Sequence, residues 1–243
     1  RLLRLGIEKG ASDIHFQVGY LPLYRFNGDL VELRYKVLTP SDTEAIARML
    51  LETDPRQEAL EWNELDLAYE LPGEGRFRVN ISRQRRFYNV VLRVIPPQVR
   101  SFEELNLPGV LRDIAQLTRG FVLVTGATGQ GKSTTLATMI QEVNCTRKAK
   151  IVTVEDPIEF VFTHDKCVIN QREVGQDTHS YENALVNAMR EAPDLLMIGE
   201  VRDRQTLQHA LLFAETGHLC MATLHANNSY HALNRIINFF PRD

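Results

Sequence analysis

The chain contains the run Gly126-Ala127-Thr128-Gly129-Gln130-Gly131-Lys132-Ser133, which matches the pattern G-x-x-x-x-G-K-[ST]. An apolar run at 121–125 precedes it, and a helical pattern at 132–143 follows it. Glycines let the backbone curl so that successive N–H groups point at phosphate oxygens, and the helix N-terminus adds a partial positive charge. Because both flanks agree with the motif, the run predicts a phosphate-binding loop rather than a chance glycine-rich turn.

The residue types in this loop predict which nucleotide chemistry it serves. Lys132 would reach the β- and γ-phosphates, and the Ser133 hydroxyl would bind Mg²⁺. We therefore expect ATP and Mg²⁺ as cofactors. The residues expected to hold the nucleotide are Gly126, Ala127, Thr128, Gly129, Gln130, Gly131, Lys132, Ser133 and Thr134.

From residue 120 onward, apolar runs alternate with helical patterns. The runs at 121–125, 151–154, 195–199 and 219–224 suit strands of a parallel sheet that is buried on both faces. Helical stretches follow at 132–143, 180–191, 203–215 and 229–239. Strand–helix alternation is typical of an α/β sheet with right-handed crossovers, which is the fold class expected for this part of the chain.

The sequence before residue 96 has a different, α+β character. Residues 20–38 alternate around Asn27-Gly28, which tolerate positive φ, and this predicts a hairpin. A helix is expected at 41–53, with Ser41 or Thr39 as its cap, and strands are expected at 65–71, 76–83 and 87–95. Prolines and a glycine mark a linker. The expected organisation is a first domain at 1–97, a linker at 98–111 and an ATPase domain at 112–243.

Hydrolysis of ATP also requires a carboxylate that holds the metal or positions the attacking water. Glu200 ends the predicted strand at 195–199, and Gly199 occupies the place where such ATPases usually carry a first acidic residue. Glu155 and Glu159 follow the strand at 151–154, and strand ends are where sites in open α/β sheets collect. Glu200, Glu155 and Glu159 are therefore the catalytic candidates, although Glu200 and Glu159 could be ordinary loop acids.

Two histidines, His218 and His225, bracket the predicted strand at 219–224. Either could sense the γ-phosphate through a hydrogen bond, or serve only as a polar cap at a strand end. Spacing alone does not separate these alternatives.

Arginines accumulate between Gly75 and Phe102, where no acidic residue occurs. The planar guanidinium donates paired hydrogen bonds to phosphate and stays charged. Aromatic residues lie among the arginines, so the run also suits single-stranded nucleic acid, or it forms a solvated basic face. The arginines are Arg76, Arg78, Arg83, Arg85, Arg86, Arg93 and Arg100.

Composition limits the remaining classes. The 243 residues are 44% hydrophobic and 24% charged, as in ordinary globular proteins, and the formal charge of -3 argues against a protein built to coat nucleic acid. The three cysteines show no CxxC pairing, and no run approaches the length of a membrane helix, so we expect a cytoplasmic protein. The chain begins without Met and stops after a helix-like pattern, so we expect both ends to be truncated.

Several motifs together resemble the type II/IV secretion ATPase superfamily in order and spacing. Beside the glycine-rich loop, the resemblance rests on residues 154–159 (VEDPIE), 169–175 (INQREVG), 198–203 (IGEVRD) and 216–225. Residues 169–175 and 10–15 (GASDIH) resemble its type IV pilus retraction branch, the PilT/PilU family, and residues 235–241 are closer to PilU. The resemblance covers nearly the whole chain.

This resemblance implies a PAS-like N-terminal domain and a RecA-like P-loop ATPase domain, assembled as a homo-hexamer. It makes Glu155 and Glu159 an Asp box, Glu200 the base of an atypical Walker B motif, and His218 and His225 a His box. Glu159 would help Ser133 to hold the metal.

The same resemblance implies that Arg78 and Arg93 reach ATP from the first domain. The implied activity is pilus retraction at the cytoplasmic face of the inner membrane. Its partners would be a pilus platform protein and a paralogous retraction ATPase. The alternatives are a related secretion ATPase, a DNA- or RNA-translocating ATPase that uses the arginine run, and a non-hydrolysing nucleotide-gated partner of another motor.

Overall fold

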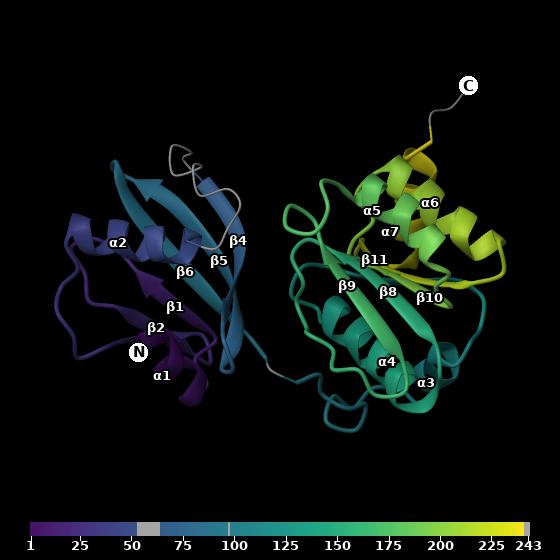
Figure 1. The fold of residues 1–243 in the computed structure, drawn as a ribbon, viewed down its shortest axis with the longest axis horizontal. Coiled ribbons are helices and arrows are strands. Elements are labelled where there is room, and N and C mark those ends of the chain that lie inside the picture. The colour runs from purple at the N-terminus through teal and green to yellow at the C-terminus, as the bar shows by residue number, and fades with distance from the viewer. Residues whose placement is uncertain (53–63, 97, 241–243) are drawn as a thin grey trace. The chain divides into compact units, whose positions relative to one another are not determined.

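The computed structural model describes residues 1–52, 64–96 and 98–240. The chain divides into two compact units, Arg1–Pro97 and Gln98–Asp243, and each is described by itself (Figure 1). The expected helix end at residue 53, Pro97 and the last three residues lie outside the described part.

The first unit is built on a six-stranded antiparallel sheet of order β3-β2-β1-β6-β5-β4. Helix α1 (Leu2–Glu8) contacts β1, and helix α2 (Pro40–Leu51) packs on β6. The strands are β1 (Asp13–Phe16), β2 (Leu23–Phe26), β3 (Asp29–Glu32), β4 (Glu64–Leu71), β5 (Gly75–Gln84) and β6 (Phe87–Ile95).

Period-two burial gives this sheet one apolar face. Phe77, Val79 and Ile81 on β5 are buried, whereas the residues between them are only half-buried. These side chains share a core with Leu50 and Leu51 of α2. The helix is capped by Thr39, whose side chain accepts from the Asp42 N–H while Asp42 accepts from the Thr39 N–H. Thr39 is thus the cap, and Ser41 is not.

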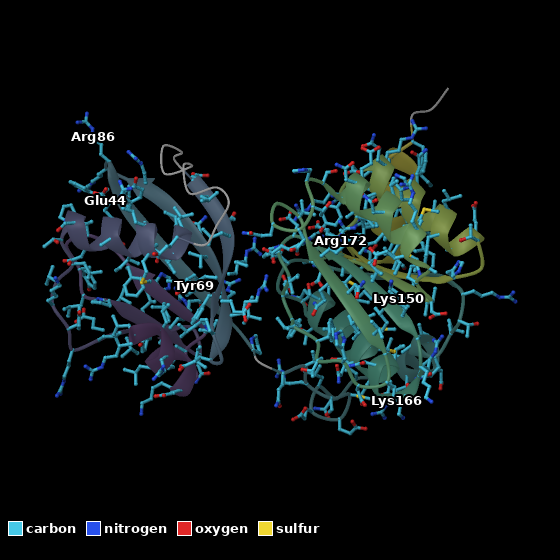
Figure 2. The ribbon with its side chains drawn as sticks, in the orientation of Figure 1. Glu44, Tyr69, Arg86, Lys150, Lys166 and Arg172 are labelled. Carbon is cyan, nitrogen blue, oxygen red and sulfur yellow. The ribbon has the colours of Figure 1, made fainter. Side chains whose placement is uncertain are left out.

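Two hairpins turn through residues with positive φ. Asn27 and Gly28 (φ 49° and 97°) join β2 to β3, which confirms the predicted hairpin. Arg85 and Arg86 (φ 52° and 74°) join β5 to β6, and Figure 2 shows Arg86 pointing away from the tip of that hairpin.

The second unit has a five-stranded parallel sheet of order β7-β11-β10-β8-β9, as expected of a RecA-like α/β domain. Its strands are β7 (Gly120–Gly126), β8 (Lys150–Glu155), β9 (Val168–Glu173), β10 (Leu195–Ile198) and β11 (Leu219–His225). Its helices are α3 (Val110–Ala115), α4 (Lys132–Thr146), α5 (Tyr181–Ala188), α6 (Arg204–Glu215) and α7 (Ser229–Asn238), with a 3-10 turn η2 (Met189–Glu191) after α5.

Helices cover this sheet on both sides (Figure 1). Met139 and Ile140 of α4 pack with Ile151 and Met197, whereas Leu185 of α5 and Leu207 of α6 pack in a second core that contains Val152 and Ile198. Neighbouring residues of one strand therefore enter opposite cores, so the strands read as continuous apolar runs.

The fold class is confirmed, and the differences lie in small elements. The structure adds β1, β9, α1 and α3 to the expected elements. The segment expected as a linker, 98–111, groups with the second unit. Its Phe102 is 3% exposed in the core beneath α4. Among the described residues, no helix is long and apolar enough to cross a membrane.

Candidate nucleotide-binding and hydrolysis site

The glycine-rich loop joins the end of β7 to the start of α4. Gly129 and Gly131 adopt φ of 78° and 79°, a conformation that side chains disfavour. Gly131 is also the N-cap of α4, and no side chain caps that helix. The first-turn N–H groups of α4 therefore keep their capacity to bind an anion.

Lys132 lies at the base of this loop and is 8% exposed. Its Nζ donates to the Ala127 carbonyl oxygen at 2.9 Å and lies 3.4 Å from His225 Nδ1. Ser133 and Thr134 follow in the first turn of α4, where both are half-buried. The amine thus contacts a loop whose residues 127–130 are exposed.

The other candidates arrive from the carboxyl ends of neighbouring parallel strands. His225 of β11 is in register with Gly126 of β7. Ile198 of β10 is in register with Val154 of β8, so Glu155 and Glu200 follow at the same edge of the sheet. The strand order therefore brings together residues that are far apart in the sequence, as strand ends in open α/β sheets do.

A row of polar contacts connects these strand ends. His225 Nε2 lies 3.3 Å from Glu200 Oε1, and His225 Nδ1 lies 3.4 Å from Thr128 Oγ1. On the other side, Arg202 Nε donates to Glu200 Oε2 at 2.8 Å and its Nη1 donates to Asp156 Oδ2 at 2.9 Å. Glu200 is therefore held at both carboxylate oxygens between the loop and β8.

Sequence reasoning missed Arg202 and Asp156 as members of this row. Both lie inside motifs that were singled out, 198–203 and 154–159. The sequence shows that the two residues carry opposite charges. That they form an ion pair follows only from the structure, in which β8 and β10 are neighbours in the sheet.

Glu155 is buried at 5% exposure, unlike the partly accessible Glu200. Its carboxylate accepts hydrogen bonds from Thr153 Oγ1 at 2.8 Å, Gln171 Nε2 at 3.3 Å and the Glu159 N–H at 3.4 Å. Burial nevertheless raises the pKa of Glu155 to about 7, because the charged form loses water. Near neutral pH this carboxyl group can therefore take up or release a proton.

The loop that carries Glu159 is braced by β9. Glu173 Oε2 accepts from the Ile158 N–H at 3.0 Å. Gln171 donates to the Phe160 carbonyl oxygen and accepts from the Phe162 N–H, both at 2.8 Å. The motif at 169–175 thus fixes the course of the Glu159 loop, a role that its polar residues did not reveal beforehand.

Gly199 occupies a place where a side chain has little room. A Cβ there would lie 3.2 Å from Glu155 Cα and 3.3 Å from the Tyr181 hydroxyl oxygen. The Gly199 N–H donates to the Val154 carbonyl oxygen at 2.8 Å, which holds β10 close to β8. This close approach is a physical reason for the missing first acidic residue.

His218 lies apart from the other candidates. It precedes β11, and its carbonyl oxygen accepts from the N–H of Gly120 at the start of β7. Its ring stacks on Phe213 at 5.0 Å between centroids, and its Nδ1 lies 3.1 Å from Thr216 Oγ1. It is therefore at the edge of the sheet opposite the loop, whereas His225 is beside the loop.

Arg78 and Arg93 belong to the first unit and lie directly opposite each other on β5 and β6. Arg93 is exposed, and its Nε donates to Asp13 Oδ1 at 3.0 Å. The side chain of Arg78 has neither a hydrogen-bond nor an ion-pair partner among the described residues.

Comparison with known proteins places these features in a family. The profile described as "Type II/IV secretion system protein" matches residues 2–240. The type IV pilus ATPase PilU of Pseudomonas aeruginosa is 46% identical over the whole chain, and the retraction ATPase PilT of the same organism is 41% identical over 242 residues. A crystal structure of the pilus retraction motor PilT with bound ADP superposes with a TM-score of 0.92 at 42% identity.

The similarity extends over all of this chain but not over all of its relatives. The chain spans 64% of the PilU relative, 70% of the PilT relative and 71% of the PilT chain in the crystal structure. On the evidence of the profile match and these identities, the chain belongs to the type II/IV secretion system protein family, in which it groups with the type IV pilus retraction ATPases.

Proposed function

We propose that this chain is the subunit of a homo-hexameric, Mg²⁺-dependent ATPase that drives type IV pilus retraction, and hence twitching motility. It would act at the cytoplasmic face of the inner membrane on a pilus platform protein, beside a paralogous retraction ATPase. One observation carries this proposal. Lys132 of the glycine-rich loop is linked through His225 to Glu200, in a chain that is 46% identical to a pilus ATPase.

The nucleotide would be bound by the loop and the first turn of α4, residues 126–134. The left-handed Gly129 and Gly131 open the backbone N–H groups toward phosphate, and Lys132 adds a point charge. Ser133 and Glu159 would hold Mg²⁺, which keeps few protein ligands because it also binds phosphate oxygens. Neither the Ser133 hydroxyl nor the Glu159 carboxylate forms a hydrogen bond or ion pair with another described residue. The oxygen atoms of both side chains are therefore available as metal ligands. When bound, the metal would neutralise charge on the phosphates.

Glu200 would position and deprotonate the attacking water. His225 contacts one carboxylate oxygen of Glu200 and lies beside Lys132. Binding of a γ-phosphate at Lys132 would therefore affect the position of Glu200 through His225. Glu155 would supply a buried carboxyl group that exchanges a proton near neutral pH. The proposed role of His218 rests on the resemblance, and its position excludes contact with the loop of its own unit.

The experiment that tests this function is an ATPase assay of the assembled protein with and without single-stranded DNA or RNA. We expect the protein to hydrolyse ATP at a rate that nucleic acid does not change. Strong stimulation would favour a nucleic-acid translocase, and absence of turnover would favour a nucleotide-gated partner. Because Lys132 contributes to both binding and transition-state stabilisation, Lys132→Ala should lower turnover by at least about 10²-fold. Near-parental turnover in that variant would exclude the assigned site.

A further inference from the structure

Asp13 lies in a row of arginines that crosses the sheet of the first unit. Cross-strand partners place Arg78 opposite Arg93, Arg93 opposite Asp13, and Asp13 opposite Arg25. Residues directly opposite each other share a face of a sheet. One acidic side chain therefore stands among three guanidinium groups on the same face.

The contacts of Asp13 use both of its carboxylate oxygens. Oδ1 accepts from Arg93 Nε at 3.0 Å. Oδ2 accepts from Ser12 Oγ at 3.0 Å and lies 3.5 Å from Arg25 Nε. Arg25 is anchored in turn, because its Nη1 donates to the Gly28 carbonyl oxygen at 2.7 Å. Asp13 is thus a fixed acceptor rather than a mobile surface acid.

Burial differs sharply across the Asp13–Arg93 pair. The Asp13 side chain is 8% exposed, whereas that of Arg93 is 70% exposed. Asp13 engages only the Nε edge of Arg93, and the terminal nitrogens of Arg93 make no hydrogen bond to a described residue. The guanidinium is therefore held at its base and presents its outer fork, which is the part that binds phosphate in pairs of hydrogen bonds.

The row also explains why Arg93 needs such an anchor. Like charges directly opposite on neighbouring strands repel each other, and Arg78 faces Arg93 without an acidic partner among the described residues. A long, exposed arginine would otherwise sample many rotamers away from its neighbour. The buried carboxylate offsets the repulsion and restricts Arg93 to one direction.

We propose that Asp13 is a positioning residue for the reaction, acting through Arg93 on the phosphates of the bound nucleotide. This inference rests on the proposed function and on the role that the family resemblance implies for Arg93, which is to reach ATP. Asp13 itself touches neither nucleotide nor water in the reaction. Its contribution is the direction of the Arg93 fork, and misplacement of a catalytic group by about 1 Å can cost about 10²-fold in rate.

A double-mutant cycle on the assembled protein tests the proposal. Asp13→Ala should lower kcat by about 10²-fold and change KM for ATP far less. The double variant Asp13→Ala/Arg93→Ala should turn over at the rate of Arg93→Ala alone, because Asp13 has nothing to position once Arg93 is gone. The inference would be overturned if the kcat losses of the two single variants multiplied in the double variant, or if Asp13→Ala had the kcat of the parent.

Matched variants separate positioning from a purely structural role. Asp66 lies on β4 of the same sheet and accepts from Asn80 Nδ2 at 3.2 Å, and it bonds to no arginine among the residues that the structure describes, so Asp66→Ala should leave kcat unchanged. Arg93→Lys should be about as slow as Arg93→Ala, because an ammonium cannot bond Asp13 and present a fork together.

If Asp13→Ala does not fold, Asp13→Asn takes its place, since the amide keeps one acceptor oxygen while the charge is lost. Its kcat should fall between those of the parent and Arg93→Ala. An Asp13→Asn kcat equal to that of the parent would overturn the inference. Lys132→Ala tests the proposed function independently. If Lys132→Ala is inactive while the Asp13 variants keep the kcat of the parent, the inference is refuted and the proposed function stands.

Discussion

At the scale of residues, the site contains two carboxylates in different surroundings. Glu155 is buried, and its pKa is raised to about 7 because the charged form loses water. Glu200 keeps access to solvent and is held by Arg202 and His225. Carboxylates whose surroundings differ in this way commonly take separate roles in one reaction. The accessible Glu200 is the better-placed base for an incoming water molecule.

Replacing Glu200 separates nucleotide binding from chemistry. Glu200→Gln keeps the shape of the side chain and its acceptor for Arg202 but loses basicity. We expect ATP affinity close to that of the parent and turnover lower by about 10²–10⁴-fold, the usual contribution of a general base. Equilibrium nucleotide binding beside steady-state turnover measures both. Loss of affinity in the variant would instead assign Glu200 to metal binding or to the fold.

The residues of the site were predictable to the extent that local motifs define them. The loop at 126–133 is identified by its motif and by the strand and helix patterns that flank it, and the strand-end positions made Glu155 and Glu200 candidates. Arg202, Asp156 and Gln171 could not be assigned roles, because their partners come from other segments of the chain. For the same reason, the spacing of His218 and His225 did not reveal which of them is beside the loop.

At the scale of elements, the approach of β10 to β8 depends on Gly199. Gly199→Ala places a Cβ 3.2 Å from Glu155 Cα and 3.4 Å from the Val154 carbonyl oxygen, so the backbone of β8 must give by a few tenths of an ångström. Overpacking of this kind costs about 1–3 kcal/mol, and we expect the free energy of unfolding to fall by that amount in urea titrations. Because Glu200 is the next residue, turnover should fall as well.

Gly109 offers a matched control for this substitution. A Cβ at Gly109 meets nothing within 4 Å, and its φ of -57° is open to any residue. Gly109→Ala should leave stability unchanged or raise it by about 0.4–1 kcal/mol. Equal stabilities of the Gly199 and Gly109 variants would contradict the close approach of the two strands.

Most strands of both sheets were predicted, including the short strand β10, whereas β1 and β9 were not. Strands such as β5 and β11 are marked by alternating or continuous apolar residues. Strand β9 reads Val-Ile-Asn-Gln-Arg-Glu, and its polar residues brace the Glu159 loop instead of filling a core. Strand β1 has only four residues. Strand β9 therefore shows no apolar pattern because its polar residues support the site, and β1 is too short to show a period.

At the scale of the whole molecule, each of the two units has its own hydrophobic core. The glycine-rich loop, Glu200 and His225 lie in the second unit, and Arg78 and Arg93 lie in the first. Under the proposal that Arg93 acts on ATP, phosphoryl chemistry would be coupled to movement of the unit that carries the arginine. In a ring, such an arginine can be delivered to the nucleotide of a neighbouring subunit.

Mixed rings test whether Arg93 acts on a neighbour. Rings made only of Arg93→Ala subunits or only of Lys132→Ala subunits should keep no more than a residual turnover, because an arginine delivered in trans contributes about 10³–10⁵-fold and the loop lysine contributes to both binding and catalysis. In a ring of both, some interfaces join an intact loop from one subunit to an intact arginine from the next. Turnover should therefore recover, with a maximum at intermediate mixing ratios.

The same experiment distinguishes this arrangement from an arginine that serves its own loop. If Arg93 acted within its own subunit, every subunit of a mixed ring would have one substitution in its own site. No mixing ratio would then restore turnover. Mixing must be shown directly, for example by co-purification through a tag on one variant. Recovery also requires Asp13 on the subunit that supplies Arg93, so Asp13→Ala/Lys132→Ala subunits should fail to rescue Arg93→Ala subunits, whereas Asp66→Ala/Lys132→Ala subunits should succeed.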